Sequence, residues 1–239
     1  GIEAFMGKRV HETLEFLYNE LLASRLPFID IVIEKYHETW DQHWHERIAI
    51  VRRENTIKFY YELGERCIAA YYRTYSPFDE LVIGTEVEFV FSINVSDDYL
   101  MKGIADRIDN DGNGNYEIHD YKSGKRAMTS YQANKDKQLA LYQIALEQNY
   151  NNIKSIKLVW HFLQHNIEIQ SNRSTKELNK LIKDTKKPFT YRATQQTYPP
   201  GSIFKLLLSA IAIEKNIISP DWKVECNGIY HFHDTAFRC

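Results

Sequence analysis

The sequence predicts an α/β fold with a mainly helical N-terminal portion, and three observations support it. Residues 7–22 place apolar side chains at three- and four-residue steps, which is the spacing of one helix face, and residues 28–46 and 50–75, rich in aromatic and charged residues, are also predicted to be helical. Residues 81–122 change to β-branched and aromatic segments of alternating polarity. A helical segment and two more strand-like segments follow, so a mixed central sheet flanked by helices is expected.

Six helices are predicted, and a proline marks the end of the N-terminal helical stretch. Ser76-Pro77 ends the N-terminal helical stretch, because proline removes a backbone donor. Helices are predicted at 7–22, 28–46, 50–75, 133–149, 175–184 and 202–215.

The strands are predicted around one recognisable turn. Residues 110–115, with the sequence NDGNGN, tolerate positive φ and so predict a hairpin turn. Strands are predicted at 81–93, 99–108, 116–122, 156–163 and 167–170.

Composition indicates the cellular environment of the protein but does not identify a binding partner. The chain has 239 residues, 44% of them hydrophobic, and a net charge of −2 from 30 basic and 32 acidic residues. This near-neutral net charge does not by itself indicate that the protein binds nucleic acid. It does not exclude such binding, because active-site carboxylates would cancel basic residues elsewhere in the sum. No stretch approaches the roughly 20 apolar residues that cross a bilayer, so no membrane partner is expected. Cys67, Cys226 and Cys239 do not make a disulfide framework, which favours a cytoplasmic setting.

Three residues on two predicted strands form a chemical constellation. Residues two apart in a strand share a face, so Asp120 and Lys122 project together while Tyr121 points the other way. An antiparallel hairpin brings Asp106 beside them. The carboxylates of Asp106 and Asp120 and the ammonium of Lys122 then occupy one small patch.

These residue types suit phosphodiester hydrolysis. Carboxylate oxygens hold Mg²⁺ or Mn²⁺ and leave positions for water and a phosphate oxygen. The metal lowers the pKa of its water, and Lys122 would orient or deprotonate that water or stabilise developing negative charge. Taken alone, the Asp-x-Lys triplet is more often a structural salt bridge on an exposed strand.

Four short segments resemble the RecB branch of the PD-(D/E)XK nuclease superfamily, which includes RecB/AddB and CRISPR-associated exonuclease-like proteins. GIADRID at 103–109 and HDYKSG at 119–124 resemble its catalytic core. GKRVHE at 7–12 resembles its helical Gly-x-x-x-His motif, and QLALY at 138–142 resembles its Gln-x-x-x-Tyr motif. Glu86 stands where the family often has an acidic residue. The resemblance implies a restriction-endonuclease-like core and spans about two-thirds of the chain.

The resemblance also implies roles for individual residues. The catalytic group would comprise Asp106, Asp120, Lys122 and Glu86. The metal ligands would be His11, Asp106, Asp120 and the carbonyl of Tyr121. Gln138 and Tyr142 lie one helical turn apart and would face the nucleic acid.

Each of these assignments has a plainer alternative. His11 alone would more often be a histidine hydrogen-bonded at a helix interface, and Tyr142 alone would be core. Glu88 has the same strand parity as Glu86, so either is a candidate for the acidic partner. Asp109 should point away from Asp106 in a regular strand and is left out of the site.

The resemblance breaks in the C-terminal tail. Many relatives bind a [4Fe–4S] cluster through one cysteine before the histidine helix and three near the C-terminus. Here Ile229 occupies the position of the second of those three, so the sequence does not support an intact iron–sulfur cluster. Cys226, His231, His233 and Cys239 nominally offer zinc ligands, but packing without a metal is the preferred interpretation. Cys67 is expected to be a buried small hydrophobe.

The segment at 173–187, which contains the helix predicted at 175–184, is basic. It carries one arginine and five lysines, which suits contact with backbone phosphates. A solvated amphipathic face, with Leu178, Leu181 and Ile182 packed inward, is an equal alternative. The segment Trp160-His161-Phe162 is expected to be core and to carry no chemistry.

The resemblance implies one nuclease domain over 1–239, with a mainly helical portion at 1–78, a catalytic α/β core at 79–172 and a helical C-terminal portion and tail at 173–239. The leading hypothesis is a Mg²⁺- or Mn²⁺-dependent deoxyribonuclease with exonuclease-like action on single-stranded or duplex DNA ends. It would serve DNA repair, recombination, or a phage- or CRISPR-related process beside a helicase or repair protein.

Two rival hypotheses remain. The first is a catalytically silent nucleic-acid-binding module of a larger helicase–nuclease assembly, which the eroded cysteine set and near-neutral charge favour and the intact Asp-x-Lys opposes. The second is a small-molecule hydrolase in which Asp106, Asp120 and His11 bind the metal.

Overall fold

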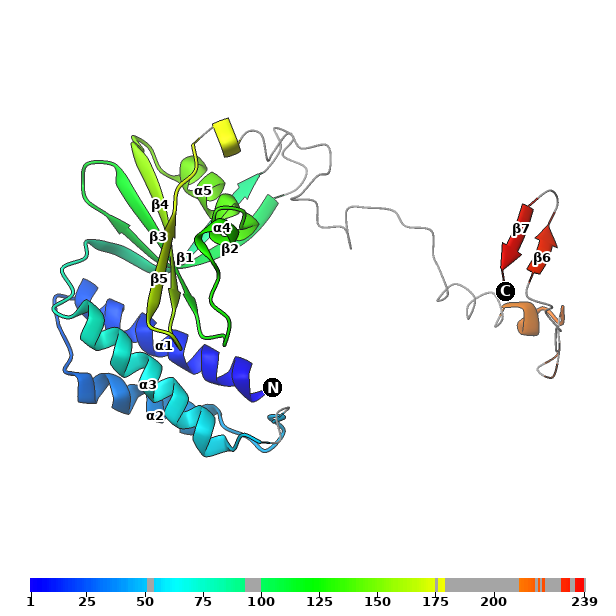
Figure 1. The fold of residues 1–239 in the computed structure, drawn as a ribbon, viewed down its shortest axis with the longest axis horizontal. Coiled ribbons are helices and arrows are strands. Elements are labelled where there is room, and N and C mark those ends of the chain that lie inside the picture. Colours follow the sequence, from blue (N-terminus) through cyan, green and yellow to red (C-terminus); the bar gives the residue numbers. More distant parts are fainter. Residues whose placement is uncertain are drawn as a thin grey trace. The chain divides into compact units, whose positions relative to one another are not determined.

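The computed structural model describes residues 1–50, 54–92, 100–174, 176–178, 211–217, 219, 221, 229–232 and 235–238. These residues belong to two compact units, 1–189 and 190–239. In the first unit, three N-terminal helices lie against a five-stranded sheet, and two more helices connect its third and fourth strands (Figure 1). The α/β class and the helical N-terminal portion predicted from the sequence are confirmed. The assignment of 1–239 to a single domain stays a prediction.

The N-terminal helices are α1 (Ile2–Leu22), α2 (Ile29–His43) and α3 (Ile57–Tyr75). All three were predicted, but α3 begins later than the periodicity indicates. Its start is fixed by Thr56, whose hydroxyl accepts a hydrogen bond of 3.1 Å from the backbone of Phe59. That N-cap satisfies a backbone donor that the helix itself leaves without a partner.

The sheet contains β1 (Val82–Ser92), β2 (Leu100–Asn110), β3 (Asn115–Lys122), β4 (Ser155–Phe162) and β5 (Ile167–Ser171) in that spatial order. The pair β3–β4 is parallel and the other neighbours are antiparallel. The predicted hairpin turn joins β2 to β3, with Asn110 opposite Tyr116. Positive φ at Gly112 and Gly114 is what makes this turn possible.

Two helices, α4 (Ser130–Ala133) and α5 (Lys137–Asn149), make the crossover between β3 and β4. Parallel neighbours require such a crossover, since a tight turn reverses direction. Helix α5 therefore runs back along the sheet and begins near the end of β3. The single helix predicted over 133–149 was wrong in one respect, because residues 134–136 are not helical and separate α4 from α5.

Each face of the sheet contributes to its own apolar core. One core joins the sheet to the crossover helices and contains Phe89, Ile118, Ala140 and Trp160. The other joins the N-terminal helices to Tyr121 of β3 and to Leu163, which directly follows β4. Cys67 is buried in the second core, as predicted, and burial raises the pKa of its thiol to about 11. The segment 160–162 is core, also as predicted.

The C-terminal region differs from the helical portion expected at 173–239. Two short strands, β6 (Ile229–Phe232) and β7 (Thr235–Arg238), form an antiparallel pair in the second unit. Of the helices predicted at 175–184 and 202–215, residues 176–178 and 211–214 are helical, and most of the remainder lies outside the described residues. Within the described part of the chain, no helix has the length and apolar character to span a membrane.

Candidate active site

The end of strand β3 places two of the predicted residues in contact. The Lys122 ammonium lies 2.6 Å from Asp120 Oδ2, so the two side chains share a face as expected. The side chain of Tyr121 points to the opposite face, where its hydroxyl lies 3.2 Å from that of Tyr71. Asp120 is buried, whereas Lys122 keeps a third of its side-chain surface exposed. Its ammonium is therefore held in place and still open to solvent.

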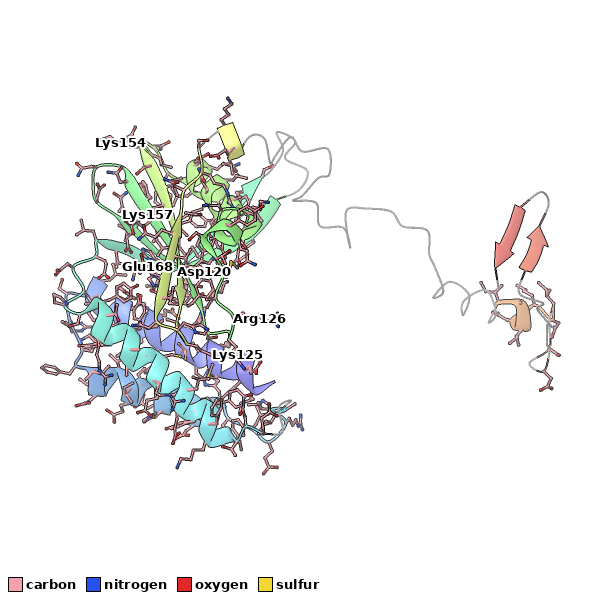
Figure 2. The ribbon with its side chains drawn as sticks, in the orientation of Figure 1. Asp120, Lys125, Arg126, Lys154, Lys157 and Glu168 are labelled. Carbon is pink, nitrogen blue, oxygen red and sulfur yellow. The ribbon has the colours of Figure 1, made fainter. Side chains whose placement is uncertain are left out.

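The first turn of α5 completes this contact. Gln138 Nε2 donates to Asp120 Oδ1 at 3.1 Å, and Lys122 donates to Gln138 Oε1 at 3.4 Å. Gln138 also donates to the Tyr142 hydroxyl at 3.1 Å, one helical turn away. The predicted Gln138–Tyr142 face thus lies against the Asp120–Lys122 pair, because the crossover returns α5 to the end of β3 (Asp120 is labelled in Figure 2).

Asp106 reaches the same place from strand β2. Its Oδ2 atom accepts a hydrogen bond of 2.7 Å from the backbone N–H of Tyr121. The ladder between β2 and β3 ends at the pair Arg107–His119, and the carboxylate takes the next backbone donor. This bond fixes Asp106 beside β3. The carbonyl of Tyr121 as a metal ligand stays a prediction.

His11 approaches from helix α1. Its Nδ1 atom lies 3.6 Å from Asp106 Oδ2. Gly7, one turn earlier, leaves room for this approach: a Cβ there would lie 2.4 Å from Ser123 Oγ, so the Ser123 hydroxyl would have to rotate away. A glycine therefore lets α1 lie directly against the loop that follows β3.

Glu86 reaches the site through an irregular strand. Its φ of 45° is in the left-handed region, which is uncommon for a residue other than glycine. The ladder with β2 keeps its register on both sides, with Thr85 opposite Arg107 and Val87 opposite Ala105, so Glu86 stands across from Asp106. Thr85 donates to Asn19 of α1 at 2.7 Å, and the next residue, Glu86, lines the cleft beside α1. The sequence did not decide whether Glu86 or Glu88 is the acidic residue of the site. Glu88 pairs with Lys102 at 2.6 Å.

One group among the described residues has the geometry of a cation site. Ligand atoms of His11, Glu86 and Asp106 lie within 4.8 Å of one another. They border a cleft of about 500 Å³ lined by Ala4, Gly7, Lys8, His11, Glu12, Glu15, Glu86, Ile104, Asp106 and Ser123. Two carboxylates and an imidazole suit a divalent cation. Asp120 lies outside this group and is engaged by Lys122 and Gln138.

Burial dominates the electrostatics of the carboxylates. Desolvation raises the pKa of Asp120 to about 6, although the Lys122 ammonium opposes the rise. Desolvation, and then the charge of Asp106, also raises the pKa of Glu86. Carboxylates with raised pKa values that lie near one another are typical of functional sites, and a bound cation would offset their charge.

Three cleft residues were not predicted from the sequence. Lys8, Glu12 and Glu15 line the cleft from α1, as His11 does. Lys8 lies three residues before His11 and Glu15 four residues after it, and this helical spacing identifies those two once His11 is placed in the site. Glu12 also pairs with Arg9 at 2.8 Å.

A buried polar network lies behind the site, between the helices and the sheet. Arg107 is 1% exposed, and its guanidinium donates to Asp109 at 2.9 Å and to the hydroxyls of Tyr71 and Tyr121. It also lies 4.2 Å from the centre of the Tyr18 ring. Asp109 therefore belongs to this network and not to the cleft, as the strand parity predicted.

The sequence matches the PD-(D/E)XK nuclease superfamily over residues 2–201. The chain belongs to the PD-(D/E)XK nuclease superfamily. This membership indicates a metal-dependent nuclease, hence a hydrolase with a nucleic-acid substrate. No curated protein matches the chain. The narrower RecB-type assignment stays a prediction.

Other expectations for this PD-(D/E)XK protein fall partly or wholly outside the described residues. The side chains of Cys226, His231, His233 and Cys239 are among these, so neither the iron–sulfur cluster nor the zinc alternative is tested. Of the basic stretch at 173–187, Arg173 donates to the backbone carbonyls of Ala133 and Asn134. Leu178 packs inward, as the amphipathic alternative expects.

Proposed function

We propose that this chain is a divalent-metal-dependent deoxyribonuclease that hydrolyses phosphodiester bonds. The observation that carries the proposal is that two groups lie side by side, the first of them lining the cleft. The first is the triplet His11, Glu86 and Asp106, and the second is the Lys122–Asp120 pair. Asp106 bonds the backbone between Asp120 and Lys122, which makes the two groups adjacent.

The first group would hold the cation. His11, Glu86 and Asp106 supply the donors, and Asp120 completes the set if Lys122 shifts toward substrate. A bound Mg²⁺ or Mn²⁺ would supply a water of lowered pKa and offset charge on the phosphate. The remaining tasks belong to the chain itself.

Lys122 is the residue suited to the reacting phosphate. Asp120 and Gln138 hold its ammonium from one side, and its exposed portion faces solvent. A fixed positive charge at that place stabilises negative charge that develops on the phosphate oxygens. Gln138 and Tyr142 lie alongside and would border the nucleic-acid strand.

A cleavage assay tests the catalytic assignment. Labelled linear DNA is incubated with Mn²⁺ or Mg²⁺ and wild-type protein, Asp120→Ala or Lys122→Ala. We expect each variant to lose about 100-fold or more of the cleavage rate. Lys157→Ala is the matched control, since Lys157 pairs with Glu117 on the same sheet but outside the cleft (Lys157 is labelled in Figure 2). Equal cleavage by wild type and both site variants would exclude the assignment.

Calorimetric titration with Mn²⁺ tests the metal site separately. Wild type should bind the ion, and Asp106→Asn and Glu86→Gln should each weaken binding markedly. Absence of binding by wild type would favour the silent module that the sequence left open. We further propose exonuclease-like action on DNA ends, in repair, recombination or a phage- or CRISPR-related process. Comparing circular with linear substrates tests that choice.

A further inference from the structure

One surface segment leaves the candidate site and returns to it. Residues 123–137, here called the arch, start after Lys122 and end before Gln138, and both flanking residues contact the site. The arch has four basic residues and one acidic residue, within a chain of net charge −2. Lys125 and Arg126 are exposed on its first part and lie at the end of the sheet away from Lys154 (Figure 2). Positive charge is thus concentrated next to the cleft.

The backbone of the arch is held at both ends. Gln164 donates to the carbonyl of Ser123 at 2.6 Å, and a ring nitrogen of His165 bonds that of Lys125 at 2.7 Å. Arg173 donates to the carbonyls of Ala133 and Asn134. In between, Thr129 and Gln132 form a reciprocal capping box at the start of α4. The exposed side chains therefore project from a backbone that is already ordered.

An exposed aromatic ring stands on this ordered backbone. Tyr131 is 68% exposed and is one of three aromatic side chains among the exposed large hydrophobics of the described residues. The ammonium of Lys135 lies 4.2 Å from the centre of its ring and also bonds its hydroxyl. An aromatic face with a cation at its side is the combination that binds an unpaired base and its phosphate.

We propose that the arch is a platform for an unpaired nucleic-acid strand, which it leads to Lys122. Tyr131 stacks on a base, and Lys125, Arg126 and Lys135 neutralise neighbouring phosphates. A base inside a duplex has both faces covered by its neighbours, so the ring selects single strands and frayed ends. This inference rests on the proposed nuclease function, because the cleft gives the strand its destination.

Strand binding is measured without cleavage. The full chain is titrated into fluorescein-labelled (dT)₂₀ or a blunt duplex of equal length, in EDTA, and anisotropy is recorded. Tyr131→Ala should weaken (dT)₂₀ binding about tenfold, and Tyr131→Phe, which keeps the ring, should stay within about twofold. Binding of the blunt duplex should change less than about twofold in either variant.

Salt dependence tests the charges. The slope of log K against log[salt] for (dT)₂₀ should fall by about 0.7 for each of Lys125→Ala, Arg126→Ala and Lys135→Ala. Lys154→Ala, an exposed lysine at the other end of the sheet, is the matched control and should leave the slope unchanged. Melting curves verify that these surface variants remain folded.

The outcomes separate the platform from the nuclease. The platform is wrong if wild type does not bind (dT)₂₀, if Tyr131→Ala binds it as tightly as wild type, or if duplex binding falls equally. The nuclease then still stands where wild type cleaves DNA in Mn²⁺ and Lys122→Ala does not. Conversely, a wild type that binds (dT)₂₀ in EDTA more tightly than Tyr131→Ala does, and yet cleaves no DNA in Mn²⁺ or Mg²⁺, would support the platform and contradict the proposed nuclease activity.

Discussion

Single polar side chains fix the geometry around the β2–β3 turn. The Asp111 carboxylate accepts hydrogen bonds from the backbone N–H groups of Asn113 and Asn115, at 2.7 and 3.1 Å. It also accepts one of 2.6 Å from the Asn115 side chain. These bonds lower the pKa of Asp111 to about 2, with the Asn115 side chain as the largest cause. The turn sets the register that aligns Asp106 with Asp120.

The lowered pKa predicts how the turn responds to acid. Because the folded pKa of about 2 lies below the ordinary aspartate value of 3.8, the stabilisation is present above about pH 4 and is lost as the pH falls toward 2. Asp111→Asn should therefore lower the Tm at pH 6, and the difference from wild type should shrink by pH 3. A Tm difference independent of pH would show that the charge has no part in holding the turn.

The residue scale is also where the sequence was most informative about the site. Alternation along β3 predicted that Asp120 and Lys122 face together and that Tyr121 does not, and the structure agrees. Alternation failed to choose between Glu86 and Glu88, because they have the same parity. The left-handed φ of Glu86 and the Lys102 partner of Glu88 distinguish them, and neither is visible in a local pattern.

Helix–helix contacts in the N-terminal layer depend on one close approach. A Cβ on Gly64 of α3 would lie 2.1 Å from the hydroxyl oxygen and 2.6 Å from Cζ of Tyr36, a buried residue of α2. The ring cannot yield easily, because its hydroxyl donates to the carbonyl of Tyr61. Gly64 is thus required for packing, although glycine is a poor helix former.

Substitution of this glycine tests the packing. Gly64→Ala should destabilise the protein by about 1 to 3 kcal/mol, even after a helix-propensity gain of up to about 1 kcal/mol. Urea unfolding measures the change, and Arg66→Ala, at an exposed position of α3, is the control. A Gly64→Ala/Tyr36→Leu double variant should lose less than the sum of the single changes, since both act on one contact. Additive losses would count against the clash.

Element boundaries show where periodicity stops being sufficient. The predicted helix over 133–149 is broken at 134–136, where Arg173 donates to backbone carbonyls that a continuous helix would use. The partner lies about forty residues further along the chain in sequence, so no local window contains the signal. The C-terminal strands β6 and β7 were missed for a different reason, since four-residue strands give a weak pattern.

At the scale of the first unit, the helical layer and the sheet are joined by a buried polar network as well as by apolar contact. Arg107 of β2 contacts Tyr18 of α1 and Tyr71 of α3 while pairing with Asp109. A buried charge of this kind is costly unless its partners are all in place. The network lies on the reverse side of β3 from Asp120, so it supports the strand that carries the site.

Removal of one partner should therefore cost more than removal of both. Arg107→Met should destabilise the protein by about 3 to 5 kcal/mol, because it leaves Asp109 buried without its guanidinium. The Arg107→Met/Asp109→Leu variant should recover part of that loss. Urea unfolding of the three proteins provides the comparison. A single variant within about 1 kcal/mol of wild type would mean that the ion pair contributes little.

The sequence by itself determined the α/β class, the hairpin and the order in which the site residues occur along the chain. It did so because hairpin pairing and the alternation of side chains are local properties. Only the tertiary structure decided that Asp106 joins His11 and Glu86 while Asp120 is held by Lys122 and Gln138. Those contacts connect α1, three strands and α5, which are brought together by the packing of α1 against the loop after β3, the pairing of β1 with β2 and the crossover between parallel strands. Packing between distant segments sets that geometry, and no periodicity within one segment encodes it.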